Sequence, residues 1–76
     1  MNSYQLNLMY AKDIIGSFDK LGVICGVTGK AVNKWYLAGK PPRTEYTGET
    51  NYAVLISNAV DGAVKPSDLI PSRAAA

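Results

Sequence analysis

Lys30, Asn33 and Lys34 are spaced three and four residues apart, so on a helix they share one face. An asparagine amide can hydrogen-bond to both the donor and the acceptor of an adenine edge, and a lysine ammonium can reach guanine acceptors or phosphate oxygens. The same residues are also typical of an ordinary solvated helix face, and alone they favour that interpretation. Together with Gly29, which has no side chain to hold a helix terminus away from a nucleic-acid backbone, they are the candidate base contacts.

These residues need a rigid support, and residues 18–37 have the pattern of a helix-turn-helix. Gly22 predicts a close crossing of two helices, and Gly26 predicts a turn in which a positive φ is favourable. Thr28 is a good N-cap for the second helix, which should end near residue 37 with a left-handed cap at Gly39. In this motif the second helix lies in the DNA major groove, which favours a DNA-binding face. The side chains expected to face inward are Leu21, Ile24, Val27, Ala31, Val32 and Trp35.

Positive charge is concentrated around this motif, although the formal net charge is only +2. Residues 18–43 contain Lys20, Lys30, Lys34, Lys40 and Arg43 against Asp19, whereas acids predominate in residues 44–76. This asymmetry suits a polyanionic partner such as double-stranded DNA. Each of these cations is equally typical of ordinary surface charge. The candidate phosphate contacts are Lys20, Thr28, Tyr36, Lys40 and Arg43.

Composition limits the other chemistry open to the chain. Cys25 is the only cysteine and there is no histidine, so neither an intrachain disulfide nor a zinc site is expected, nor any cofactor. The scattered Asp and Glu residues have no His or Cys partner, so we expect neither an enzyme nor a small-molecule substrate. No apolar run is long enough to cross a bilayer and no signal-peptide pattern is present, so a cytoplasmic location is expected. Cys25 and Trp35 are expected to be core residues.

The residues before the motif predict one amphipathic helix. Residues 1–5 are expected to form a loose start, followed by a helix over residues 6–17 that Gly16 weakens and ends. Asp19 is expected to be the N-cap or a first-turn acid of a short helix over residues 20–25. The expected inward face of the first helix is Leu8, Ala11, Ile14, Ile15 and Phe18.

The residues after the motif complete an all-α prediction of four main helices and a short fifth, within one domain over residues 1–76. Residues 43–49 fit either a turn or the first turn of a helix. A helix over residues 50–59 should bury Tyr52, Leu55, Ile56 and Ala59, with Val54 and Val60 on other faces. Ser67 is expected to cap a single short turn, and residues 72–76 to form a frayed tail.

The chain resembles the all-helical Cro repressors of lambdoid bacteriophages. Residues 8–15 followed by Phe18 look like the first helix of these proteins, and the recognition-helix match is Ala31-Val32-Asn33-Lys34. The turn at residues 26–28 and the closing segment at residues 61–71 are similar to YdaS-type helix-turn-helix proteins, which overlap with that family. The resemblance covers roughly residues 8–71.

The resemblance implies a small repressor, encoded by a phage or prophage, that acts in a bacterial host cell. Such a protein binds operator DNA as a homodimer, with Gly29, Lys30, Asn33 and Lys34 as the recognition contacts. Two departures matter. Lambda Cro has a longer polar residue where Gly29 stands, and it dimerises through β-strands, whereas residues 50–71 here have a helical pattern. A dimer is therefore expected to use the helix over residues 52–60.

Two other functions fit the same pattern. A YdaS-type antitoxin or transcriptional activator would use the same helix on DNA, and gene neighbours rather than the sequence would separate these roles. A protein-interaction module built on the helix-turn-helix fold is motivated by the modest net charge and by the apolar residues between 54 and 60. Binding to a partner protein with an affinity that does not depend on salt would support the protein-interaction module.

Overall fold

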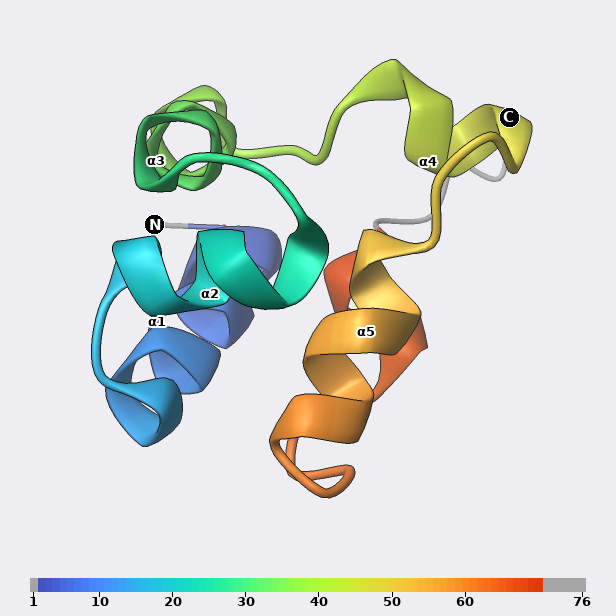
Figure 1. Ribbon diagram of the computed structural model, residues 1–76. Coiled ribbons are helices and arrows are strands. Elements are labelled where there is room, and N and C mark those ends of the chain that lie inside the picture. The colour runs from blue at the N-terminus through green and yellow to red at the C-terminus, as the bar shows by residue number, and fades with distance from the viewer. Residues whose placement is uncertain (1, 71–76) are drawn as a thin grey trace.

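The computed structural model describes residues 2–70 and contains only helices in that part of the chain. Figure 1 shows α1 and α2 side by side beneath α3, and an extended linker that runs from α3 to α4. The other end of the molecule is formed by α5 and the 3₁₀ helix η1, which pack against each other. The all-α prediction is therefore confirmed. The elements are α1 (Ser3–Ile15), α2 (Phe18–Cys25), α3 (Gly29–Ala38), α4 (Arg43–Thr47), α5 (Tyr52–Ala59) and η1 (Pro66–Leu69).

The first helix begins earlier than expected. Asn2 is its N-cap, and the prediction of a loose start is wrong for residues 2–5. The Asn2 side chain accepts a hydrogen bond from the Gln5 backbone N–H at 2.8 Å, and the Gln5 side chain accepts one from the Asn2 backbone N–H at 2.9 Å. This reciprocal pair is a capping box, which satisfies two N–H groups that the helix itself leaves unpaired.

The buried face of α1 is centred on Tyr4, Leu8 and Ala11. Ile14 was expected on this face but is 46% exposed. The predicted face was too broad, because Ile14 and Ile15 are adjacent and only Ile15 packs against the core. Gly16 ends α1 with a positive φ of 124°, as its position predicts.

The helix-turn-helix consists of α2 and α3, which pack against each other. Ser17, rather than Asp19, is the N-cap of α2, and Asp19 is the acid in its first turn. Gly26 has a left-handed φ of 76°, which confirms its predicted place in the turn. At Gly22 a Cβ would lie 2.7 Å from the Val27 carbonyl oxygen. Only glycine allows α2 to pack this closely on the turn, as the spacing predicts.

A short helix and a buried carboxylate join the motif to α5. Pro42 precedes α4, so the ambiguous residues 43–49 form a helical turn that Gly48 ends. Glu45 is 7% exposed, and its carboxylate accepts hydrogen bonds from the Tyr52 and Ala53 backbone N–H groups, both at 2.9 Å. The Thr50 hydroxyl donates to the same carboxylate. Glu45 thus occupies the N-terminus of α5, where a negative charge is favourable.

The buried face of α5 differs from the predicted one. The helix buries Ala53, Ile56 and Ser57, and Val60 behind its end is 5% exposed, while Ala59 faces solvent. Both sets of residues have helical spacing, and α5 is apolar on several faces, so periodicity cannot choose between them. Packing against α2 and η1 decides the face. The surplus apolar surface expected of this helix is reduced accordingly, because Val60 belongs to the core.

The C-terminal segment closes over α1 and α5. Ser67 lies inside η1 and does not cap it, so that prediction is wrong. Instead the Asp68 carboxylate accepts a hydrogen bond from the Lys65 backbone N–H at 3.1 Å. The tail predicted over residues 72–76 lies outside the described residues.

One cluster of apolar side chains connects α1, α2, α3, α5 and η1. Trp35 and Val27 are partly buried and pack against it, as the inward face of the motif predicts. The cluster supports α3 from one side only and leaves its other face to solvent. Its members are Tyr4, Leu8, Ala11, Leu21, Cys25, Val32, Ala53, Ile56, Val60, Val64 and Leu69.

Candidate nucleic-acid interface

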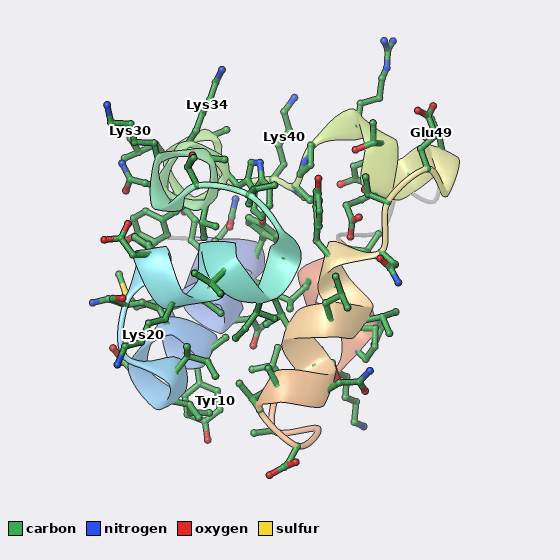
Figure 2. The ribbon with its side chains drawn as sticks, viewed as in Figure 1. Tyr10, Lys20, Lys30, Lys34, Lys40 and Glu49 are labelled. Carbon is green, nitrogen blue, oxygen red and sulfur yellow. The ribbon has the colours of Figure 1, made fainter. Side chains whose placement is uncertain are left out.

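The second helix of the motif, α3, has one buried and one exposed face. Val32 is fully buried, whereas Lys30, Asn33 and Lys34 are exposed. Figure 2 shows the Lys30 and Lys34 side chains projecting from α3 on the side away from α1 and α2. The exposed face of α3 therefore carries one amide and two ammonium groups, and these side chains project into solvent. Leu37, which is 70% exposed, adds apolar surface to the helix.

The N-terminus of α3 is capped by Thr28. Its hydroxyl oxygen accepts a hydrogen bond from the Ala31 backbone N–H at 3.2 Å, which confirms the predicted cap. Thr28 is exposed, so its hydroxyl lies at the surface beside the first turn of α3.

Gly29 is packed against α2. A Cβ at this position would collide with the Asp19 carboxylate and would lie 2.9 Å from the Asp19 Cα. The absence of a side chain is therefore required by the contact between α2 and α3. Any contact that Gly29 makes with a ligand uses its backbone. The Asp19 carboxylate also places a negative charge near the positive end of the α3 helix dipole.

The cationic surface continues from α3 into the linker and α4. Figure 2 shows Lys40 projecting from the same side as Lys30 and Lys34. An open groove of about 570 Å³ lies between the end of α3 and α4, and its charged lining residues are Lys34, Lys40 and Arg43. Glu49 also projects from this side, beyond α4, and marks the border of the cationic surface. The other residues that line the groove are Trp35, Ala38, Pro41, Pro42, Tyr46 and Thr47.

Two of the candidate phosphate contacts lie elsewhere. Figure 2 shows Lys20 well apart from Lys30, Lys34 and Lys40. Its Nζ lies 3.4 Å from the place that a Cβ on Gly16 would take, at the end of α1. Tyr36 is partly buried and packs against Phe18, with ring centroids 5.7 Å apart. The structure therefore brings together the polar face of α3 with Lys40 and Arg43, and leaves Lys20 outside this group.

Asn2 and Gln5 are residues near this face that the sequence analysis missed. The Asn2 side-chain amide donates a hydrogen bond to the Gly39 carbonyl, and the Gln5 amide donates one to the Tyr36 carbonyl, both at 2.9 Å. Asn followed three residues later by Gln is a capping-box signal, so the start of α1 was readable from the sequence. Their contacts with the end of α3 were not, because they join residues more than thirty positions apart.

The described residues offer little support for metal binding or for a cysteine nucleophile. No group of three or more His, Cys, Asp or Glu side chains there could hold a metal ion. Cys25 is 8% exposed, and burial, helped by the Glu45 charge, raises the pKa of its thiol to about 11. A thiol with a raised pKa is a poor nucleophile, which fits the expected inert core residue. No helix in residues 2–70 is long and apolar enough to cross a membrane.

Comparison with known proteins gives one informative match. The chain is 54% identical over 39 residues to the 8.4 kDa cro protein of Escherichia phage HK022. The match covers 51% of this chain and 51% of that protein, so the chain spans about half the length of the curated relative it matches. No family profile matches the chain, and no solved structure does. The similarity supports a Cro-like family.

Proposed function

We propose that this protein is a sequence-specific transcriptional repressor of the phage Cro type. The observation that carries the proposal is the shared direction of Lys30, Lys34 and Lys40, which project from one side of the molecule over the exposed face of α3. An exposed helix with flanking cations matches the width and the charge of the DNA major groove. The 54% sequence identity over 39 residues with a phage Cro protein supports the same role.

In the proposed complex α3 lies in the major groove. Asn33 bonds to an adenine edge, and Lys30 and Lys34 bond to guanine acceptors or to phosphates at the groove edge. Gly29 contributes only its backbone, because a Cβ at this position would point toward Asp19. Thr28, Lys40 and Arg43 contact phosphates and hold the protein in register without selecting sequence.

Repression follows from occupancy, since a protein bound across a promoter excludes polymerase from it. The proposed binding unit on DNA is a homodimer, which places two α3 helices in successive major grooves. The operator should then be nearly palindromic, with half-sites about 34 Å apart.

Selection of bound duplexes from a random DNA pool tests the proposal, followed by anisotropy titration of the selected duplex at several salt concentrations. We expect an enriched palindrome, and an affinity that falls steeply with salt because bound phosphates release counterions. A Lys30→Ala/Asn33→Ala/Lys34→Ala variant should retain the fold and lose the selected site. Weak binding with no enriched sequence would refute the repressor.

The same interface would serve a YdaS-type antitoxin or an activator. A reporter gene placed downstream of the selected operator separates a repressor, which lowers its expression, from an activator, which raises it, and gene neighbours identify an antitoxin.

One observation favours a protein-interaction module as a second candidate. Leu6, Tyr10 and Ile14 are exposed by 57%, 51% and 46% and lie four residues apart on α1. Figure 2 shows Tyr10 at the opposite end of the molecule from Lys34. This apolar stripe would remain available while α3 occupies DNA. A protein complex insensitive to salt, together with no DNA binding at low salt, would favour this function over the repressor.

A further inference from the structure

The start of α1 is joined to the end of α3 by two side-chain amides. Asn2 donates from Nδ2 to the Gly39 carbonyl oxygen, and Gln5 donates from Nε2 to the Tyr36 carbonyl oxygen, each at 2.9 Å. Figure 1 shows the start of α1 below α3. These bonds connect residues 37 and 31 positions apart in the sequence.

Each amide uses both of its polar atoms. The oxygens of Asn2 and Gln5 accept the backbone N–H groups that form the α1 capping box, at 2.8 and 2.9 Å. The nitrogens donate to two carbonyls at the end of α3. The Tyr36 carbonyl also accepts from the Gly39 backbone N–H at 3.1 Å, and the Gly39 carbonyl lies beyond the last turn of the helix. A carboxylate at either position would preserve the first function and abolish the second, because it accepts hydrogen bonds but cannot donate them.

The packing around these bonds is close. A Cβ on Gly39 would lie 2.7 Å from the Asn2 Nδ2 atom, so the left-handed cap of α3 rests directly on the Asn2 side chain. Lys40 follows Gly39 and begins the cationic linker. The two amides therefore fix the end of the recognition helix and the start of the segment that carries Lys40 and Arg43.

We propose that Asn2 and Gln5 are positioning residues, which set the angle of α3 and the path of the linker relative to the rest of the fold. The inference rests on the proposed function. Base contacts require side chains held within about 0.5 Å of their productive positions, whereas phosphate contacts by flexible lysines tolerate larger shifts. Release of the α3 C-terminus should therefore damage sequence selection more than electrostatic affinity.

The test uses the isosteric double variant Asn2→Asp/Gln5→Glu. Its carboxylates still cap α1, and they repel the α3 carbonyls instead of binding them. Ser3→Asp/Leu6→Glu is a charge-matched control at two exposed positions of the same two turns, and Asn2→Ser is an uncharged variant that keeps a good N-cap but cannot reach Gly39. Affinity for the selected operator and for a scrambled duplex is measured at several salt concentrations, at a temperature where circular dichroism shows each variant folded.

We expect Asn2→Asp/Gln5→Glu to bind the operator about tenfold more weakly than the charge-matched control, since two bonds at the helix terminus are lost. Affinity for the scrambled duplex and its salt dependence should equal those of the control. Asn2→Ser should show part of the operator loss with no change in charge. In the free protein, the amide NMR signals of Gly39 and Lys40 should shift in both of these variants and not in the control.

Equal operator affinity for Asn2→Asp/Gln5→Glu and the charge-matched control would overturn the inference, as would an equal loss on both duplexes. Failure of the proposed function is a separate result, because the wild-type protein would then select no operator. In that case the NMR signals of Gly39 and Lys40 still decide whether the two amides hold the end of α3.

Discussion

The Trp35 indole stacks on the Tyr52 ring, with ring centroids 4.8 Å apart and an interplanar angle of 23°. Trp35 lies on the inner side of α3, and Tyr52 is the first residue of α5. The stack therefore connects the helix that carries the candidate base contacts to the C-terminal half of the fold, and it does so one residue away from Lys34.

Truncation of Trp35 should cost substantial stability. We expect Trp35→Ala to lower the free energy of unfolding by about 3 kcal/mol, because it removes the stack on Tyr52 and the packing of the indole against the core. Urea unfolding followed by circular dichroism measures the change. Leu37→Ala on the same helix is the control, and its effect should stay within about 0.5 kcal/mol because Leu37 is 70% exposed. Similar losses for both variants would contradict the assigned role of Trp35.

Asn33 and Lys34 should fail in different ways when truncated. Asn33→Ala should relax specificity at one base position, with a loss of about 1–3 kcal/mol on the preferred base and little on others. Lys34→Ala, if Lys34 meets phosphate, should weaken binding to all sequences and reduce the slope of log affinity against log salt by about 1. Lys20→Ala is the control, since Lys20 lies apart from this face, and it should alter neither property. Equal loss on every sequence for both variants would refute base recognition by Asn33.

Gly22 should not tolerate alanine, although alanine is normally the better helix residue. A Cβ there would lie 2.7 Å from the Val27 carbonyl oxygen and 2.8 Å from the Thr28 carbonyl carbon, both backbone atoms. We expect Gly22→Ala to destabilise the fold by about 1–3 kcal/mol, measured by thermal unfolding. Gly48→Ala is the comparison, because nothing lies within 4 Å of a Cβ there and only the φ of 84° is strained. A stabilised Gly22→Ala protein would show that the turn can move away from α2.

Alkaline pH should destabilise the protein through Cys25. Its pKa is raised from 9.0 to about 11 by burial, so the folded state keeps the thiol protonated while the unfolded state ionises. The stability that depends on the neutral Cys25 thiol is complete below pH 9 and is lost between pH 9 and about 11. In that range the free energy of unfolding falls with a slope approaching 1.4 kcal/mol per pH unit. Chemical denaturation at a series of pH values measures this slope.

Cys25→Ala should flatten the slope between pH 9 and 10. Tyr4 also has a raised pKa, through burial and then the charge of Glu45, but its ordinary value is 10.0 and its contribution begins at higher pH. Tyr4→Phe should therefore leave the slope near pH 9 in place and flatten it at higher pH. An unchanged slope in Cys25→Ala would mean that the thiol ionises in the folded protein as it does in the unfolded one.

The helix-turn-helix was predictable because its signals are local. Gly26, Thr28 and Gly39 each act on the residues beside them in the sequence, as a turn, an N-cap and a C-cap, and the structure has all three in these roles. The separation of exposed Asn33 from buried Val32 follows from helical spacing once the caps are placed.

The features that were missed depend on distant partners or on competing local signals. Nothing around Glu45 in the sequence indicates that its carboxylate is buried at the N-terminus of α5. The carboxylate meets its donors, the Tyr52 and Ala53 backbone N–H groups, only in the folded chain. Helical periodicity places Val60 off the buried face, because α5 is apolar on more than one face and only packing selects among them. Asn2 differs from these residues, because its spacing from Gln5 is a local capping-box signal. The loose start predicted for residues 1–5 overlooks that signal.

The collision between a Cβ at position 29 and Asp19 has a consequence for how such proteins diversify. Under the proposed function, a lineage selected for a new operator can exchange Lys30, Asn33 and Lys34 at little cost to the core, because all three are exposed. Position 29 is closed to that search, because a Cβ there would meet both the Asp19 carboxylate and the Asp19 Cα, so a smaller residue 19 would not by itself make room. A side chain at position 29 is therefore expected among relatives only together with a change in how α2 packs on α3.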